Sequence, residues 1–337
     1  MFGIFHACHY LYCMICILSR EKDPFFNLAA EEYLLKNYAD DIFMVWESRN
    51  AVVVGKHQNA LAEINYRFVM ENAIPVARRL SGGGTVFHGP GNVNFTFIRN
   101  GEPGKLVDFQ RFIAPVAGFL HSLGIDAQVG SQHEILAAGK KISGNAEHVF
   151  KSRILHHGTL LYNADLAMLK ESIKTVPGKY KDRAVQSNRS SVVNIADLLA
   201  HSMTETEFSE TLFEYTRQQF TGRLHTFTAN EAASIGTLKD NRYNTWDWVY
   251  GWSPDYEFHQ ATTAGTIPIE IFLTVHRGRV IQCRLQSPDL PEAFMEGVAS
   301  ATNGCAHEFS QVLEIITLAK LDKLAAADRQ ELAWAFF

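Results

Sequence analysis

A glycine-rich stretch constrains this chain more than any other feature. Arg78 and Arg79 lead into Leu80-Ser81-Gly82-Gly83-Gly84, and two β-type runs follow, Thr85–Phe87 and Val93–Phe97. Glycine permits positive φ angles and lets main-chain N–H groups approach a ligand closely, because it has no Cβ atom. Successive N–H groups form an anion-binding concavity, and arginine adds a planar, permanently charged donor. The stretch therefore predicts an anion-binding loop between strands, suited to a nucleotide phosphate.

This loop differs from two common phosphate-binding loops. A Walker A loop continues with Lys and then Ser or Thr after its last glycine, whereas Gly84 is followed by Thr85 and Val86. A dinucleotide-binding loop opens a helix, whereas a strand is expected here. The alternative interpretation is a glycine-rich hairpin whose arginines are solvated.

The loop resembles the lipoate-binding loop of the lipoate–protein ligase A family, which shares its catalytic fold with biotin–protein ligases. The shared pattern is Arg-Arg-x-Ser-Gly-Gly-Gly-x-Val-Phe-His, and further family motifs follow in the family's order. The resemblance covers nearly the whole chain from about Met14. The other matching segments are Asp23–Glu32, Val54–Asn59, Gly139–Gly144, His156–Leu161 and Thr245–Trp248.

Short β-type runs with a few amphipathic helices favour an α+β fold over a doubly wound sheet. In the first helix, Leu28, Leu34 and Leu35 are expected on the apolar side, with Glu31 and Glu32 opposite. The aromatic stretch 238–257 predicts an interdomain hinge. Strands are expected near 14–19, 42–46, 51–55, 127, 135–138, 141–146, 154–161, 267–275 and 280–285, and helices near 27–37, 62–71, 109–123, 196–220, 291–302, 308–317 and 328–336.

The resemblance implies a catalytic domain of mixed and antiparallel β-sheets flanked by helices, over residues 1–245. A smaller α+β accessory domain is expected over residues 255–337. Because the resemblance begins near Met14, the first 13 residues are either an extension or the product of a mis-assigned start.

The composition argues against nucleic-acid-binding, membrane and disulfide-rich secreted proteins. The chain has 337 residues and a formal net charge of −5, so a general nucleic-acid surface is not favoured. No apolar run is long enough for a bilayer-spanning helix, which argues against a membrane protein. The five cysteines are an odd number without a secreted-type framework, which indicates a reducing cytoplasm. Cys13 and Cys16 form a C-x-x-C without a second pair, so small buried hydrophobes are favoured over a zinc site.

The resemblance implies an ATP-dependent ligase that activates lipoate or octanoate as an acyl-AMP and releases pyrophosphate. The acyl group then passes to a lysine of a lipoyl domain. The implied acceptors are the acyltransferase subunits of 2-oxoacid dehydrogenases and the glycine-cleavage H protein. ATP chemistry implies Mg²⁺, although no carboxylate cluster that would bind the metal is visible in the sequence.

The family's motifs assign roles to individual residues. Lys141 matches the catalytic lysine of Lys-x-Ser-Gly, and Lys140 is expected to be solvated. The polar segment 174–194 matches a loop that orders over the nucleotide. Residues implied to bind ATP and the acyl-adenylate are Arg79, Gly83, Gly84, Thr85, Val86, Phe87, Lys141 and Asn188. Residues implied to bind lipoate are Trp46, Val54, Arg79, His88, Lys141 and His157.

The chain departs from the family at two places. Gly89 and Pro90 stand where the family has Asp-x after the loop histidine, so a role of that aspartate is missing here. Glu134 stands where the family has Asp before the catalytic lysine, and we expect it to pair with Lys141 or with magnesium. These changes bear on efficiency and substrate preference more than on fold.

Two other functions remain open at this point. One is a lipoyl- or octanoyltransferase of the same fold that uses a preformed donor. A thioester version is disfavoured because the cysteines, at positions 8, 13, 16, 283 and 305, lie outside the motif-bearing core. The other is a non-catalytic protein that stores an acyl-adenylate, which the presence of Lys141 argues against.

Overall fold

The computed structural model describes residues 14–102, 104, 106–188, 190–319 and 325–337. Its contacts divide the chain into two units, each assembled from three segments. The first unit comprises Met1–Ser48, Pro90–Ala164 and Ser190–Gly236, and the second comprises Arg49–Gly89, Asp165–Arg189 and Thr237–Phe337, as far as these residues are described. The expected domains 1–245 and 255–337 stay a prediction.

An eight-stranded mixed sheet forms the centre of the first unit, with the order β12-β1-β2-β6-β10-β9-β8-β7. β1 pairs in parallel with β2 and β12, and the other neighbours are antiparallel. The strands are β1 (Ile15–Leu18), β2 (Ile42–Glu47), β6 (Asn92–Asn100), β7 (Gln128–Val129), β8 (Ile135–Ala137), β9 (Lys140–Phe150), β10 (Arg153–Leu161) and β12 (Arg223–Leu224).

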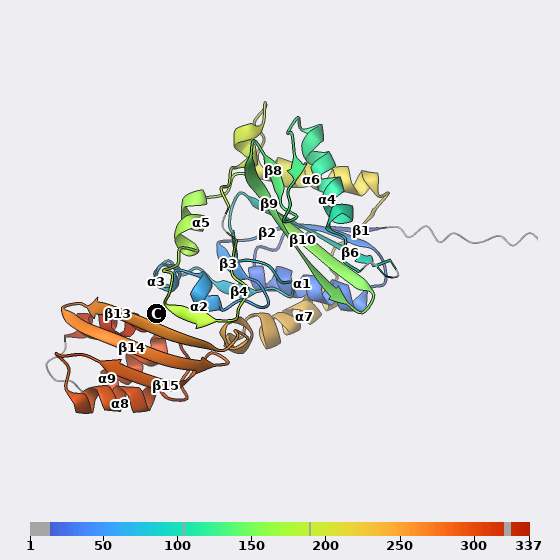
Figure 1. Ribbon diagram of the computed structural model, residues 1–337. Coiled ribbons are helices and arrows are strands. Elements are labelled where there is room, and N and C mark those ends of the chain that lie inside the picture. Colours follow the sequence, from blue (N-terminus) through green and yellow to red (C-terminus); the bar gives the residue numbers. More distant parts are fainter. Residues whose placement is uncertain (1–13, 103, 105, 189, 320–324) are drawn as a thin grey trace, which may run out of the picture. The chain divides into compact units, whose positions relative to one another are not determined.

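Helices pack against this sheet in the first unit (Figure 1). α4 (Phe109–Ser122) and α6 (Glu205–Gln219) share a hydrophobic core with Phe95 and Phe97 of β6. Side chains alternate along a strand, so Thr96 projects to the other face, where its hydroxyl meets Glu31 of α1 (Pro24–Asn37). One sheet face therefore carries the aromatic core, and the opposite face carries polar side chains next to α1.

The second unit contains two smaller sheets. β3 (Ala51–Val54) lies between β4 (Val76–Arg78) and β5 (Val86–His88), and a four-stranded sheet has the order β11-β13-β14-β15. α8 packs on β15 and α10 on β13. The remaining bounds are β11 (Tyr180–Asp182), β13 (Tyr256–Ala264), β14 (Ile267–His276), β15 (Arg279–Gln286), α2 (Ala60–Glu63), α3 (Tyr66–Glu71), α5 (Leu166–Ser172), α8 (Glu292–Thr302), α9 (Phe309–Leu318) and α10 (Ala326–Trp334).

The α+β class predicted from the sequence is confirmed, as are α4, the strands β9 and β10, and the β14–β15 hairpin. The strands predicted near 42–46 and 51–55 are β2 and β3, which belong to different sheets. α1 begins three residues early, because Asp23 accepts a hydrogen bond from the Phe25 amide at 3.1 Å and Pro24 takes the first turn. No helix within the described ranges is long and apolar enough to cross a bilayer.

Two helix predictions were wrong in detail, and one helix was not predicted. The segment 196–220 is a 3₁₀ turn, η1 (Ile195–Leu198), followed by α6, because Thr204 and Glu207 form a capping box that starts a new helix. The segment 62–71 divides into α2 and α3, where Asn65 caps α3. The aromatic stretch begins after an unpredicted α7 (Ala229–Leu238) and forms two π-helical turns, η2 (Lys239–Tyr243) and η3 (Asp247–Gly251).

Candidate active site

In the first unit, the strand register aligns predicted residues across the sheet. Trp46 on β2 is opposite Asn94 on β6, Asn94 is opposite Thr159 on β10, and Thr159 is opposite Gly144 on β9. This row crosses three strand spacings, or about 14 Å. A Cβ atom on Gly144 would lie 3.3 Å from Nζ of Lys141, so the lysine side chain ends beside the row. The structure thus brings Trp46 and the Lys141 ammonium to one sheet face.

The main chain of Lys141 is fixed on both sides. It pairs with Leu136 of β8, its amide donates to the Ser191 carbonyl at 2.9 Å, and its carbonyl accepts from the Val193 amide at 3.2 Å. Lys141 is half-buried, whereas Lys140 is exposed, as expected. These bonds fix the point from which the Lys141 side chain leaves the strand.

A buried carboxylate that the sequence did not point to organises the same sheet face. Oε1 of Glu31 accepts from the Thr96 hydroxyl at 2.6 Å, and Nδ1 of His157 lies 3.0 Å from both carboxylate oxygens. The Trp46 indole N–H donates to Thr96 Oγ at 3.1 Å, so the Thr96 hydroxyl accepts from Trp46 and donates to Glu31. Because a carboxylate only accepts, His157 carries a proton on Nδ1 and donates it to Glu31. Glu31 thereby orients both Trp46 and His157.

In the second unit, Arg79 is buried inside the glycine-rich loop and holds its shape. Nη2 donates to the Gly82 and Gly84 carbonyls, at 2.7 Å each, while Nη1 donates to the Val53 carbonyl and Nε to the Ser81 hydroxyl. Gly83 has a φ of +84°, which favours glycine. The guanidinium that the sequence predicted as an anion ligand thus binds main-chain oxygens of its own loop.

This contact sets the direction of the loop amides. In a trans peptide the carbonyl of one residue and the N–H of the next point in opposite directions. Because the Gly82 and Gly84 carbonyls point at Arg79, the N–H groups of Gly83 and Thr85 point away from it. The loop therefore presents amides on its outer side, as an anion-binding loop requires.

Arg78 is buried and binds main-chain carbonyls behind the loop, so it stabilises the surrounding structure and does not form part of the loop surface. Its side chain is fully buried and donates to main-chain carbonyls of Gly55, Gln58 and Val249, among others. The Trp248 indole donates back to the Arg78 carbonyl at 2.8 Å. Burial, followed by the charge of Arg79, lowers the pKa of Arg78 to about 9, so it stays charged at neutral pH. The tryptophan-rich stretch thus anchors the strand that leads into the loop.

The other predicted residues of the second unit flank the glycine-rich loop in sequence or structure. Val54 ends β3 and is buried, and its carbonyl accepts from the Arg79 amide at 3.1 Å. Val86, Phe87 and His88 form β5 beside β3, and Phe87 joins the hydrophobic core. Asn188 is exposed and follows Ser187, whose hydroxyl accepts from the Thr85 amide at 2.8 Å. Gln58, Glu63 and Ser187 contact this loop directly or through one another. They were missed because two of them lie in loops and Glu63 ends the one-turn helix α2, where no periodic signal marks a residue.

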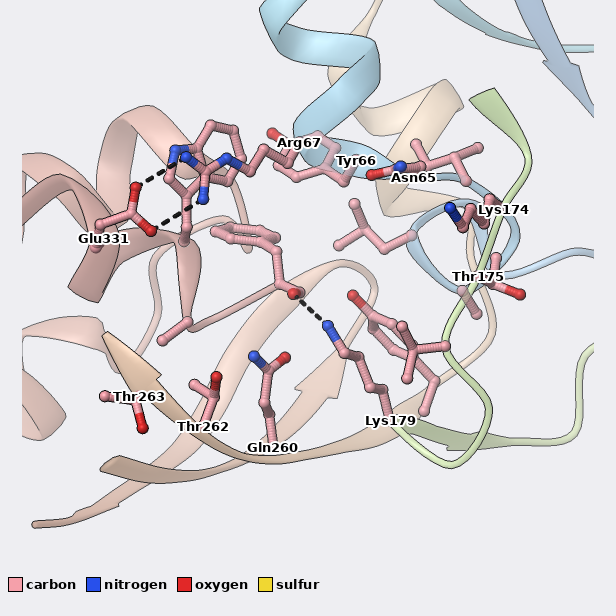
Figure 2. Close-up of a pocket in the computed structure, with 18 residues that line it drawn as sticks. Asn65, Tyr66, Arg67, Lys174, Thr175, Lys179, Gln260, Thr262, Thr263 and Glu331 are labelled. Carbon is pink, nitrogen blue, oxygen red and sulfur yellow. Dashed lines mark hydrogen bonds and ion pairs between the residues drawn. The ribbon is translucent and has the colours of Figure 1, made fainter. Parts of the chain in front are cut away.

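A pocket of about 270 Å³ in the second unit lies apart from the predicted residues, none of which lines it (Figure 2). Its cations are already engaged. Arg67 donates to both carboxylate oxygens of Glu331, at 2.8 and 2.9 Å, and Lys179 donates to the Phe337 main-chain oxygen at 3.0 Å. A second pocket, of about 240 Å³, is lined by Glu63, Ser187 and neighbouring residues.

Metal ligands and nucleophilic thiols are not evident within the described ranges. No group of three or more His, Cys, Asp or Glu side chains there is placed to hold a metal. Glu134 accepts from the Gln132 amide at 2.8 Å within its own turn. Cys16 is buried in β1, and burial raises the pKa of Cys283 to about 12 and of Cys305 to about 11. The C-x-x-C prediction involves Cys13, and together with Cys8 it lies outside the described residues.

Comparison with known proteins identifies relatives over most of the chain. Residues 23–217 match the lipoyl protein ligase A/B catalytic domain. The chain is 32% identical over 297 residues to lipoate–protein ligase 1 of Staphylococcus aureus, covering 88% of this chain and 90% of that protein. Its fold is similar to LipL1 of P. falciparum in complex with lipoate (TM-score 0.62, 23% identity, 93% and 95% of the two chains). It is also similar to a lipoate–protein ligase A bound with ATP (TM-score 0.60, 24% identity, 71% and 98%).

Proposed function

The chain belongs to the family of lipoate–protein ligases and is an ATP-dependent ligase, and we propose that it joins lipoate or octanoate to a lysine of a lipoyl domain in two steps. In the first step the acyl carboxylate attacks the α-phosphate of ATP, which forms acyl-AMP and releases pyrophosphate. In the second step the acceptor amine attacks the acyl carbonyl, and AMP leaves.

The observation that supports the activation step is the direction of the loop amides. Arg79 draws the Gly82 and Gly84 carbonyls inward, so the amides of Gly83 and Thr85 face outward to bind phosphate oxygens. Arg79 adds positive charge directly behind these amides. Gly84, Val86, Phe87 and Asn188 are proposed to complete the nucleotide contacts, and Val54 and His88 those of lipoate.

The support for acyl binding in the first unit is the row from Trp46 to Gly144. An extended eight-carbon chain is about 8 Å long, at the roughly 1.2 Å per bond of an extended backbone. It therefore fits along a row of about 14 Å, with Trp46 at one end and the Lys141 ammonium at the other. We assign Lys141 to the acyl carboxylate and to the oxyanion that forms during transfer. His157, oriented by Glu31, lies on the same sheet face.

Magnesium is proposed to enter with the nucleotide. Mg²⁺ usually keeps several waters and binds substrate phosphates together with few protein carboxylates. The described residues offer no metal-binding cluster, so no step is assigned to a protein-bound metal.

The proposed acceptors are apo lipoyl domains of 2-oxoacid dehydrogenase acyltransferase subunits and the glycine-cleavage H protein. The alternative, a transferase that takes the acyl group from a thioester through a cysteine, needs a reactive thiolate. The high pKa values of Cys283 and Cys305 and the burial of Cys16 argue against it for the thiols within the described ranges.

Pyrophosphate release with ATP, magnesium and lipoate, measured before any acceptor is added, tests the first step. Release that depends on lipoate is expected. If none occurs while synthetic lipoyl-AMP still supports transfer, the protein is a transferase on a ligase fold.

Lys141→Ala tests the assignment of the catalytic lysine. We expect it to slow transfer to an apo lipoyl domain by about a hundredfold or more, because it removes an oxyanion-stabilising cation. Lys140→Ala, which removes the exposed neighbouring lysine, is the matched control and should transfer within about twofold of the wild-type rate. Wild-type transfer by Lys141→Ala would exclude it from the mechanism.

A further inference from the structure

Ser187 makes a set of hydrogen bonds to the glycine-rich loop and its surroundings, all within the second unit. Its hydroxyl oxygen accepts from the Thr85 amide at 2.8 Å and from Nε2 of Gln58 at 3.1 Å. The hydroxyl donates to one carboxylate oxygen of Glu63, and the Ser187 amide donates to the other oxygen at 3.2 Å. Glu63 therefore accepts two hydrogen bonds from Ser187, one from its hydroxyl and one from its amide.

The directions of these bonds are fixed by chemistry. A main-chain amide only donates and a carboxylate only accepts. Oε1 of Gln58 accepts from the Gly55 amide at 2.8 Å and from the Thr85 hydroxyl at 2.9 Å, so its Nε2 must face Ser187. A hydroxyl has one proton and two lone pairs, and Ser187 uses all three. Its hydroxyl is therefore saturated by protein partners.

The close approach depends on a glycine. A Cβ atom on residue 84 would lie 3.1 Å from both Cα and Oγ of Ser187. Gly84 thus leaves room for Ser187 to reach the Thr85 amide. The third glycine of the loop has a use in the ligand-free protein as well as in phosphate binding.

We propose that Ser187 is a latch on the nucleotide site: the Thr85 amide binds either the Ser187 hydroxyl or a phosphate oxygen of ATP, and Glu63 holds the hydroxyl in the blocking position. The inference rests on the proposed phosphate-binding function of the glycine-rich loop. An amide proton engaged at 2.8 Å is not available to a second acceptor with good geometry. The Glu63 carboxylate also repels a phosphate approaching the same amide. ATP binding therefore breaks the hydrogen bond between the Thr85 amide and the Ser187 hydroxyl.

The latch is tested first without nucleotide, through hydrogen exchange of the Thr85 amide. Labelling glycine with ¹³C and threonine with ¹⁵N selects the Gly-Thr pairs, which are Thr85, Thr159, Thr237 and Thr266, so three internal references accompany Thr85. In Ser187→Ala, exchange at Thr85 should be about fivefold faster, as for loss of a hydrogen bond of ordinary strength. Gln186→Ala, an exposed neighbour with no hydrogen bond to this loop among the described residues, should leave it unchanged.

ATP affinity then tests whether the Ser187 hydroxyl competes with ATP for the Thr85 amide. Ser187→Ala should bind ATP about fivefold more tightly than wild type, because the competing hydroxyl is gone. Glu63→Gln should act in the same direction, since an amide has only one accepting oxygen for the two Ser187 donors that Glu63 binds. Gln186→Ala should match wild type.

The results of the exchange and ATP-binding measurements distinguish a failure of the latch proposal from a failure of the proposed ATP-dependent function. Equal Thr85 exchange in Ser187→Ala and wild type, or faster exchange with unchanged or weaker ATP binding, overturns the latch. A wild-type protein that binds no ATP would instead overturn the proposed function, and the exchange measurement would reveal this separately because it uses no nucleotide.

Discussion

Replacing Arg78 with lysine tests whether this arginine is part of the scaffold or part of the anion site. The guanidinium is fully buried and makes seven hydrogen bonds to six acceptors in the second unit. The acceptors are the carbonyls of Gly55, Lys56, Gln58, Trp248 and Val249 and the hydroxyl of Ser253. Lysine keeps the charge but has three donors, so at least three acceptors lose their partner.

The loss in free energy of unfolding can be estimated from the acceptors that lose their hydrogen bonds. Each buried acceptor left without a partner costs about 1–3 kcal/mol, so three give a loss of roughly 3–5 kcal/mol when the smaller values dominate. At about 2.1 cal/mol/K per residue, the 337 residues give an unfolding entropy of roughly 0.7 kcal/mol/K, so 1 kcal/mol shifts Tm by about 1.4 °C and Arg78→Lys should melt roughly 4–7 °C below wild type. Arg67→Lys is the control. Arg67 is 46% exposed and pairs with Glu331, so the same change there should cost less than about 1 kcal/mol.

Calorimetric or fluorescence-detected unfolding of the three proteins measures this difference, and ATP affinity at a temperature where all are folded completes the assay. We expect Arg78→Lys to lose stability and keep most of its ATP affinity. A variant with wild-type stability and much weaker ATP binding would show that Arg78 contacts the nucleotide, and the reasoning from its buried acceptors would be wrong.

Two further predictions concern buried titratable groups. Glu31→Gln should raise the KM for lipoate about tenfold and leave the KM for ATP unchanged, because the neutral amide accepts more weakly than a carboxylate and its nitrogen cannot replace Oε2 as an acceptor for His157. A loss of about 1–2 kcal/mol corresponds to this factor. Glu32→Gln, equally buried but paired with Lys36, is its control, and an equal effect of both variants would contradict the assignment. Burial lowers the pKa of His307 to about 4, so the unfolded chain binds its proton at higher pH than the folded one. Stability should therefore fall by up to roughly 3 kcal/mol as pH drops from about 6.5 to 4, and His307→Gln should flatten this part of a pH-dependent denaturation series.

The parts of the fold that could be predicted are those that depend on local chemistry. Glycine permits the positive φ that Gly83 adopts in the loop, and the apolar alternation on either side of Arg277-Gly278 matches the observed β14–β15 hairpin. α4 has a single apolar side, so its position against a sheet follows from sequence. The helix predicted over 196–220 failed for a local reason as well, since the capping box at Thr204 outweighs the apolar periodicity that spans it.

The burial of Glu31 could not be predicted from the residues near it in the sequence. On α1 the apolar and polar positions are not segregated, and Glu31 was expected opposite the apolar residues. The structure buries it, because its hydrogen-bond partners lie 65 and 126 residues further along the chain, on β6 and β10. A carboxylate looks like a surface residue until the donors that compensate its burial are known. No single-sequence pattern connects Glu31 to Thr96 and His157.

The two neighbouring arginines, Arg78 and Arg79, have different surroundings, which the sequence alone does not show. The sequence treats them as one cationic pair, but adjacent residues at the end of a strand point in opposite directions. Arg78 therefore meets the carbonyls around Gly55 and Val249, and Arg79 meets those of Gly82 and Gly84. Most of the hydrogen bonds that these two side chains donate go to main-chain oxygens, and one from each goes to a serine hydroxyl. Under the proposed function, a phosphate would therefore meet amides whose direction Arg79 sets, with the charge of the arginine behind them.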